Sequence, residues 1–253
     1  MNKKNILITG ASSGIGRSMA LMLATDHHHL FLIARREDRL KELEKEILKL
    51  NSNVTVTLIP SDVNSNDITN KITNACNSRI DILINNAGLA LGREKVQDSA
   101  FDEWEQMIQT NVVSAFKICH LVVPWMLKHG GGDIINLCSI AGHYNYSGGA
   151  VYCATKHAVK AFTRILREET CGKNIRVMQI SPGMVDTEFS TVRFKGDKKL
   201  AQSVYTGMTP LSADDIARMM KFMLDQPRHV VIDEIITMPT DQGSPTTVSR
   251  KQS

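Results

Sequence analysis

The chain has 253 residues, of which 42% are hydrophobic and 22% are charged, and these values are typical of a globular protein. This length suits one α/β domain and is long enough to bury a sizeable core. The formal net charge of +4 is mild, and basic and acidic residues are interspersed. Nothing therefore indicates a nucleic-acid partner, whereas an anionic small ligand stays open.

Seven short runs rich in apolar and β-branched residues alternate with longer helical patterns. The predicted strands are Asn5–Thr9, Leu30–Ala34, Val54–Pro60, Ile82–Asn85, Asp133–Cys138, Ile175–Ile180 and Ile232–Met238. Most lack a polar alternation, as strands buried on both faces do. The alternation predicts an α/β fold: a single doubly wound Rossmann-type domain over residues 1–253, with a mostly seven-stranded parallel sheet and helices on both faces.

Two helices have clear sequence signals. In the range 39–50, one apolar stripe is formed by Leu40, Leu43, Ile47 and Leu50, with charged residues elsewhere. Further along, Ser212 and Asp215 have the spacing of a capping box, which predicts a helix over 213–224.

Two segments fall outside the alternation. Residues 188–209 form the main irregular stretch, and we predict that they are a substrate lid, because long connections inside compact domains are often binding loops. The polar tail, residues 240–253, is expected either to be disordered or to pack on a neighbouring subunit.

Cysteine usage and the N-terminus suggest a location. The five cysteines are odd in number and have no C-x-x-C spacing, which favours a reducing compartment and packing roles for Cys138 and Cys153. The first apolar run is too short for a signal sequence, and apolar stretches such as 121–127 are too short for a membrane span. We predict a cytoplasmic protein without membrane contact.

The three histidines at positions 27–29 invite a metal hypothesis. Neighbours in an extended chain alternate faces, so His27, His28 and His29 cannot all point at one ion. We interpret them as a solvated turn and predict no metal.

A glycine-rich turn follows the first predicted strand. It contains Gly10, Ser12, Ser13, Gly14, Ile15 and Gly16, with the glycines spaced G-x-x-x-G-x-G. Glycine lets the backbone approach a pyrophosphate closely, and the helix that follows offers free N–H groups and a positive dipole end. A strand before the turn and a helix after it predict a dinucleotide site.

The second predicted strand is followed by Arg35 and Arg36, where an NAD site would place an acid for the ribose 2′-hydroxyl. Arginine suits a phosphate, so we predict NADP(H); the alternative is a pair of solvated residues at a helix start. After the third strand, Asp62 and Val63 lie at the ligand edge of the sheet. Asp62 could bind the adenine amine or cap the next helix.

Tyr152 and Lys156 are four residues apart near the start of a predicted helix and so share a face. We expect the ammonium of Lys156 to lower the pKa of the phenol, which could then exchange a proton with an alcohol or carbonyl oxygen. Ser139 follows the fifth strand and could orient that oxygen. Asn111 lies within a helical stretch, where Asn is mildly unfavourable; it is either functional or a buried amide bonded to backbone.

Together with Asn85-Asn86-Ala87-Gly88 and Pro182-Gly183, these motifs resemble the short-chain dehydrogenase/reductase family over nearly the whole chain. The resemblance implies a catalytic tetrad of Asn111, Ser139, Tyr152 and Lys156. It further implies that Asn111 holds a water linked to Lys156 and that Lys156 also binds the nicotinamide ribose. The remaining cofactor contacts would be Asn86 and Gly88 on the adenosine ribose side, and Pro182, Gly183, Val185 and Thr187 near the carboxamide. Family members commonly form tetramers, so a homotetramer is expected.

The segment 188–197 and the sequence Met238-Pro239-Thr240 resemble the NADP-dependent 3-hydroxy acid dehydrogenases, including those of serine and allo-threonine. We predict hydride transfer between the nicotinamide and the 3-hydroxyl or 3-oxo carbon of small hydroxy acids. Ser139 and Tyr152 would bind the substrate oxygen, and Arg193 would bind the carboxylate unless it is an ordinary surface arginine. The alternatives are a broad NADPH carbonyl reductase and a non-catalytic NADP(H) sensor, although sensors typically lose the Tyr or the Lys.

Overall fold

The computed structural model describes residues 3–251. Its main sheet has seven parallel strands in the order β3-β2-β1-β4-β5-β6-β9. The strands are β1 (Asn5–Thr9), β2 (His29–Ala34), β3 (Thr55–Pro60), β4 (Ile82–Asn85), β5 (Gly132–Leu137), β6 (Ile175–Pro182) and β9 (Glu234–Thr237). The order reverses between β1 and β4, and doubly wound sheets bind ligands at the carboxyl ends of strands at such a point.

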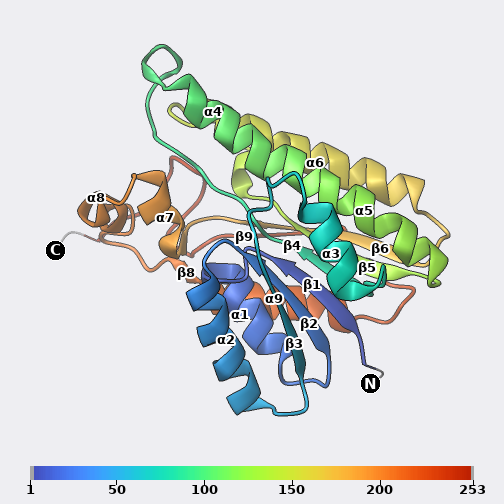
Figure 1. Cartoon of the computed structure of the whole chain (residues 1–253). Helices are drawn as coiled ribbons and strands as arrows, with labels where there is room; N and C mark the ends of the chain where they lie inside the picture. The colour runs from blue at the N-terminus through green and yellow to red at the C-terminus, as the bar shows by residue number, and fades with distance from the viewer. Residues whose placement is uncertain (1–2, 252–253) are drawn as a thin grey trace.

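Helices cover both faces of the sheet (Figure 1). One layer contains α1 (Gly14–Leu23), α2 (Glu37–Leu50) and α9 (Ala213–Asp225). The other contains α3 (Ile68–Cys76), α5 (Ser114–Lys128) and α6 (Ala150–Glu169), and α4 (Phe101–Ile108) continues into α5 through a π-helical turn, Gln109–Val113. The predicted doubly wound, seven-stranded α/β domain is confirmed.

The strands are buried on both sides because successive side chains point to opposite faces. In β1, Ile6 and Ile8 pack in the core beneath α1, α2 and α9, while Leu7 packs in the core beneath α3, α5 and α6. All three side chains are fully buried. The apolar runs in the sequence therefore correspond to a sheet between two helical layers.

The helical predictions hold with one exception. Leu40, Leu43 and Ile47 are fully buried, but Leu50 is 63% exposed, because it is the last residue of α2 and lies beyond the packed stripe. The capping box of α9 is present: Asp215 N donates to Ser212 Oγ over 3.2 Å, and Ser212 N donates to Asp215 Oδ2 over 2.7 Å.

The segment predicted to be irregular is largely helical. It contains α7 (Glu188–Arg193), whose first turn is capped by Thr187, and α8 (Lys198–Ser203), capped by Asp197. A two-residue strand lies on each side of it, β7 (Val185–Asp186) and β8 (Leu211–Ser212), and the two strands pair with one another. The segment is thus a helical excursion whose two ends are tied together.

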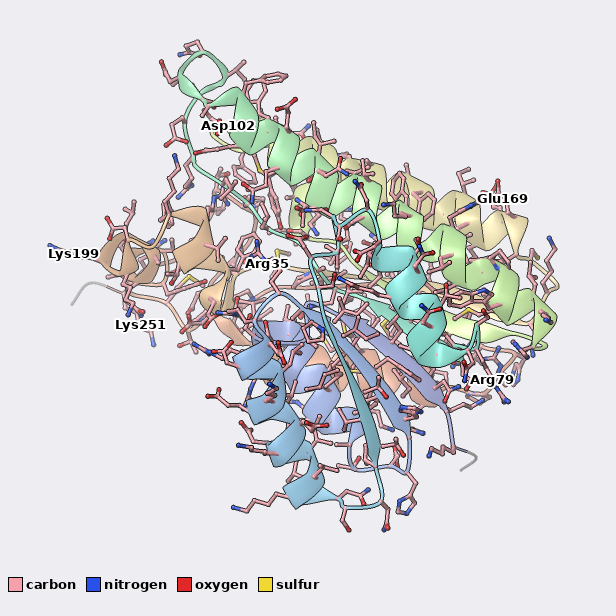
Figure 2. The ribbon with its side chains drawn as sticks, in the orientation of Figure 1. Arg35, Arg79, Asp102, Glu169, Lys199 and Lys251 are labelled. Atoms are coloured by element: carbon pink, nitrogen blue, oxygen red, sulfur yellow. The ribbon has the colours of Figure 1, made fainter. Side chains whose placement is uncertain are left out.

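The described part of the tail, residues 240–251, packs against that excursion in its own chain, and residues 252–253 lie outside the described range. Lys251 N donates to the carbonyl of Gly207 over 2.8 Å, and Arg250 Nη2 donates to that of Val204 over 3.0 Å. Lys251 and Lys199 accordingly lie at the same end of the molecule in Figure 2. The expectation of a disordered tail is wrong for these residues.

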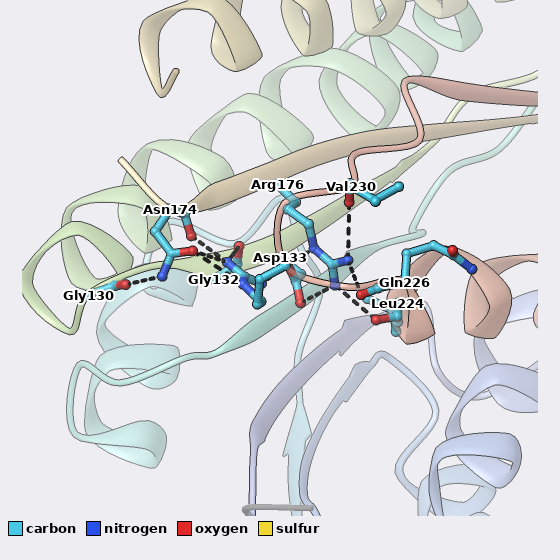
Figure 3. Close-up of polar contacts among 9 residues, drawn as sticks. Gly130, Gly132, Asp133, Asn174, Arg176, Leu224, Gln226 and Val230 are labelled. Carbon is cyan, nitrogen blue, oxygen red and sulfur yellow. Dashed lines mark hydrogen bonds and ion pairs between the residues drawn. The ribbon is translucent and has the colours of Figure 1, made fainter. Parts of the chain in front are cut away.

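A buried ion pair joins β5, β6 and α9 at the amino ends of the strands (Figure 3). Arg176 is 3% exposed, and its Nε and Nη2 donate to the two carboxylate oxygens of Asp133 over 2.7 and 2.9 Å. Its other donors reach the carbonyls of Leu224 and Gln226, each over 2.9 Å, at the carboxyl end of α9. This arrangement satisfies both charges and helix carbonyls that have no partner within the helix.

The helical run Phe101–Lys128 has 28 residues and is, by length and composition alone, apolar enough to cross a membrane. It is longer than the apolar stretches considered in the sequence. Ile118, Val122 and Met126 are fully buried in the core between the sheet and helices α3, α5 and α6, as expected of a core helix. The absence of membrane contact stays a prediction.

Candidate active site

A cleft of about 340 Å³ lies at the carboxyl ends of the strands. It runs from Arg36, beside β2, to Tyr152 and Lys156 on α6. Except for Gly16, every residue predicted to bind the cofactor lines it: Gly10, Ser12, Ser13, Gly14, Ile15, Arg35, Arg36, Asp62, Val63, Asn86, Gly88, Tyr152, Lys156, Pro182, Gly183, Val185 and Thr187. The predicted residues therefore meet in one elongated site.

The glycine turn is shaped by close backbone contacts. Gly10 has a φ of +67° and Gly14 a φ of +51°, both in the left-handed region. A Cβ on Gly16 would lie 2.5 Å from the carbonyl oxygen of Gly10, so this glycine closes the turn from behind. Asn86 Nδ2 holds the same turn by donating to the carbonyl of Thr9 over 2.9 Å.

The turn leads directly into α1, and the side chain of the N-cap residue, Ser13, makes no capping hydrogen bond. Free N–H groups of the first helical turn therefore face the cleft together with the positive end of the helix dipole. This cradle fits the pyrophosphate of a dinucleotide.

Two cations border the other end of the cleft. The Arg35 side chain is 63% exposed, and its Nη1 lies 4.0 Å from Asp62 Oδ2. Arg36 Nη2 lies 3.4 Å from Ser12 Oγ and 2.7 Å from Glu188 Oε2. Asp62 Oδ1 accepts from Asn64 N over 2.9 Å, so this residue both lines the cleft and closes a turn. The guanidinium groups of Arg35 and Arg36, which both border this end of the cleft, fit a phosphate-bearing ligand.

Tyr152, Lys156 and Ser139 meet at the inner end of the cleft. Tyr152 is 8% exposed and Lys156 is 4% exposed, both on the inward face of α6. Lys156 Nζ donates to the carbonyl of Leu137 over 3.0 Å and lies 5.8 Å from the centroid of the Tyr152 ring. Ser139 lies at the end of β5, and its Oγ accepts from Ala141 N over 3.1 Å.

The acid–base properties differ from those predicted. Burial raises the pKa of Tyr152 well above its usual range, while the hydroxyl of Ser139 and the guanidinium of Arg193 act in the opposite direction. Burial lowers the pKa of Lys156. The expected lowering of the pKa of Tyr152 is therefore not what the structure gives: burial raises this pKa and outweighs the opposing charge of Arg193.

Asn111 lies in the π-helical turn, 2% exposed, and does not line the cleft. Its Oδ1 accepts from Leu89 N over 2.8 Å, and its Nδ2 donates to the carbonyl of Leu89 over 2.7 Å and to Thr155 Oγ1 over 3.1 Å. The side chain thus ties the loop after β4 to α6 one residue before Lys156. This geometry corresponds to the alternative of a buried amide bonded to backbone.

A second cavity of about 120 Å³ lies beside Tyr152 and Ser139 and is bordered by Arg193 of α7. Arg193 Nε donates to the carbonyl of Gly92 over 3.0 Å, and Nη2 to that of Gly148 over 3.3 Å. Each Nη atom carries two hydrogens, so the guanidinium retains donors for a ligand.

Several residues that line the two cavities were not predicted from the sequence. Glu188 borders the cofactor cleft, and Arg93 and Gln242 border the second cavity. Cys138 also lines the cleft; its Sγ donates to the carbonyl of Lys156 over 3.2 Å, and burial raises the pKa of its thiol. The sequence placed Glu188 in the predicted lid without a role of its own and did not mark Gln242, because their positions in the site arise from contacts between distant segments.

Within residues 3–251, no group of three or more His, Cys, Asp or Glu side chains is arranged to hold a metal ion. We expected a solvated turn at the three histidines, but His28 is only 6% exposed, and Lys4 N lies 3.4 Å from its Nδ1. The neighbouring His29 Nε2 contacts Thr57 Oγ1 over 2.8 Å.

Residues 4–198 match the family model described as short chain dehydrogenase. The chain belongs to the short-chain dehydrogenase family. It is 43% identical to an NADP-dependent 3-hydroxy acid dehydrogenase of Schizosaccharomyces pombe, over 100% of this chain and 98% of that protein. It is 37% identical to a serine 3-dehydrogenase of Agrobacterium fabrum, over 94% of each.

Among solved structures, the closed form of a serine dehydrogenase complexed with NADP⁺ superimposes with a TM-score of 0.88 and 35% identity, covering 98% of this chain and 100% of that one. The predicted family membership and fold are confirmed. This short-chain dehydrogenase is an oxidoreductase that acts on hydroxyl groups.

Proposed function

We propose that this short-chain dehydrogenase uses NADP(H) to interconvert the 3-hydroxyl and 3-oxo forms of small hydroxy acids such as serine, allo-threonine and 3-hydroxybutyrate. The observation that carries the proposal is one cleft with Arg35 and Arg36 at its adenosine end and Tyr152, Ser139 and Lys156 at its inner end. When bound there, NADP(H) supplies or accepts the hydride at C4 of its nicotinamide.

In this proposal the hydroxyl of Ser139 and the phenol of Tyr152 hold the substrate oxygen. Since burial raises the pKa of Tyr152, the phenol is protonated at neutral pH and can donate its proton to a carbonyl oxygen during reduction. During oxidation the deprotonated phenol takes the proton of the alcohol. Lys156 binds the nicotinamide ribose, and Asn111 positions the segments on either side of it.

The hydroxy acid specificity rests on Arg193. Its guanidinium borders the cavity next to Tyr152 and keeps free N–H donors with which a carboxylate could form charge-assisted hydrogen bonds. The names of the similar proteins, a 3-hydroxy acid dehydrogenase and serine dehydrogenases, support the same class of substrate.

A broad NADPH carbonyl reductase is the second candidate. It is favoured by the protein acceptors that Arg193 already has, Gly92, Tyr146 and Gly148, and by aromatic side chains such as Phe189 and Phe194 in the wall of the cavity. A guanidinium used mainly to hold the lid would leave the pocket without a requirement for a carboxylate.

The deciding experiment measures initial rates of NADP⁺ reduction with L-serine, L-allo-threonine, 3-hydroxybutyrate and butan-2-ol, which has no carboxylate. High kcat/KM for the acids and little turnover of butan-2-ol would support the hydroxy acid dehydrogenase. Equal or better turnover of butan-2-ol would favour the broad reductase. Parallel assays with NAD⁺ test the cofactor preference.

We also propose a homotetramer located in the cytoplasm. Helices α4 and α6 expose large apolar side chains that a second copy could cover: Phe101 is 68%, Ile108 46% and Ile165 52% exposed. Light scattering of the purified protein measures the oligomeric state, and a monomer would contradict the proposal.

A further inference from the structure

An ion pair connects the start of the lid to the start of α2. Glu188 is the first residue of α7, and its Oε2 lies 2.7 Å from Arg36 Nη2. Its other oxygen, Oε1, lies 3.5 Å from Arg39 Nη1. The hydrogen bond from Arg36 and the charges of both arginines lower the pKa of Glu188, so the side chain is a carboxylate at neutral pH.

This ion pair lies inside the cofactor cleft. Glu188 and Arg36 both line the cleft, and so does Ser12, the other polar neighbour of the Arg36 guanidinium. The residue before the lid, Thr187, packs on the glycine turn, since its Cβ lies 3.3 Å from the position that a Cβ on Gly14 would occupy. The carboxylate of Glu188 therefore binds the guanidinium of Arg36, to which the 2′-phosphate of NADP(H) binds in the proposed function.

We propose that Glu188 is an internal competitor of the 2′-phosphate of NADP(H) for the guanidinium of Arg36. The proposal rests on the assignment of Arg36 to this phosphate. Two anions then compete for one guanidinium. The phosphate can form all of its hydrogen bonds with Arg36 only when the carboxylate of Glu188 has moved away. NAD(H), which lacks the phosphate, leaves the ion pair intact.

Competition makes the lid sensitive to the kind of cofactor bound. Displaced from Arg36, the first residue of α7 keeps only its longer contact with Arg39 of α2, while Thr187 still packs on the glycine turn. Glu188 would thus limit the affinity for NADP(H) and favour its release after turnover. It is a positioning and selectivity residue, not a catalytic one.

The size of the effect is limited by solvent. The side chains of Glu188 and Arg36 are 40% and 42% exposed, so water and salt screen their attraction. Exposed ion pairs contribute roughly 0.2–1 kcal/mol, which corresponds to a change of about 1.4- to 5-fold in affinity. The effect should shrink as the salt concentration rises.

The test compares dissociation constants of Glu188→Gln and the unmodified enzyme for NADP⁺, 2′,5′-ADP, NAD⁺ and 5′-AMP by calorimetry. The substitution should tighten binding of NADP⁺ and 2′,5′-ADP, which carry the 2′-phosphate, about 1.4- to 5-fold and leave binding of NAD⁺ and 5′-AMP unchanged. A suitable control is Glu37→Gln, which removes one negative charge from the first turn of α2. Glu37 pairs with Lys41 over 2.8 Å and does not line the cleft.

A double-substitution cycle separates this proposal from its premise. Arg36→Gln alone should weaken NADP⁺, and in that background Glu188→Gln should no longer change the preference for NADP⁺ over NAD⁺. If Arg36→Gln leaves the preference for NADP⁺ over NAD⁺ intact, the 2′-phosphate binds elsewhere. The assignment of Arg36 and the role of Glu188 are then both overturned. If Arg36→Gln weakens NADP⁺ but Glu188→Gln weakens it too, or shifts all four ligands equally, only the role of Glu188 is overturned.

Discussion

Replacing Arg193 by alanine removes the cation that borders both the substrate cavity and the phenol of Tyr152. The Arg193 guanidinium lies 5.8 Å from the centroid of the Tyr152 ring. Hydrogen bonds to charged groups contribute about 1.5–3 kcal/mol, so kcat/KM for carboxylate substrates should fall roughly 10- to 150-fold. The assay is the initial rate of NADP⁺ reduction with 3-hydroxybutyrate and with butan-2-ol.

The uncharged alcohol isolates the carboxylate contact from structural effects. Arg193 also ties α7 to the loops at Gly92 and Gly148, and loss of these ties affects both substrates alike. The ratio of the two kcat/KM values therefore reports the carboxylate contact alone. Arg193→Lys keeps the charge without the planar fork and should lie between the alanine variant and the unmodified enzyme.

Arg193 also lowers the pKa of Tyr152, so its removal should move the increase of the oxidation rate to higher pH. An equal loss for 3-hydroxybutyrate and butan-2-ol would refute the carboxylate contact and leave Arg193 a purely structural role. An unchanged pH profile would show that its charge does not act on Tyr152.

Three further predictions follow from the site and the core. Tyr152→Phe should lower kcat by about 10²- to 10⁴-fold while NADP⁺ binding measured by calorimetry is retained; preserved turnover would place the proton chemistry elsewhere. Because burial raises the pKa of Tyr152 above its usual range, the phenol stays protonated through neutral and moderately alkaline pH. Alcohol oxidation should therefore increase steadily with pH, whereas carbonyl reduction should stay level over the same range; parallel profiles would contradict this protonation state. Asp133→Ala leaves the buried cation of Arg176 without its carboxylate partner and should lower the free energy of unfolding by about 3–5 kcal/mol in urea titrations. The kcat of the folded enzyme should not change. A loss below 1 kcal/mol, roughly the range of an exposed ion pair, would mean that solvent reaches Arg176.

The sheet was predictable because burial on both faces leaves an apolar signal that does not depend on distant segments. β1 and β4 agree with their predicted ranges, and the other strands differ by one or two residues at an end. The longest extension is in β6, which continues two residues to Pro182 because Pro182 still pairs with Thr237 of β9. That extension depends on a partner more than fifty residues away, which the local pattern cannot specify.

The cofactor cleft was predictable for a related reason. Parallel strands bring their carboxyl ends to one edge, so residues that follow different strands, such as Gly10, Asp62 and Ser139, converge without any knowledge of side-chain contacts. Lysine and tyrosine four residues apart on a helix had to share a face. The spacing showed a cation near Tyr152 but not the burial that raises its pKa, because burial depends on distant segments.

Contacts made by the segment 188–209 mark the limit of this reasoning. The sequence predicted Arg36 as a phosphate ligand, but Glu188 is 152 residues away in the chain and nothing in the sequence pairs the two. They meet because the paired strands β7 and β8 hold the ends of this segment, and Thr187 seats its first turn on the glycine turn. The same arrangement places Arg193, one helical turn and a half later, beside Tyr152. One short helix therefore contacts both Arg36 and Tyr152, at opposite ends of the cleft, so a change at Glu188 should alter substrate KM as well as cofactor affinity if α7 moves as a rigid unit.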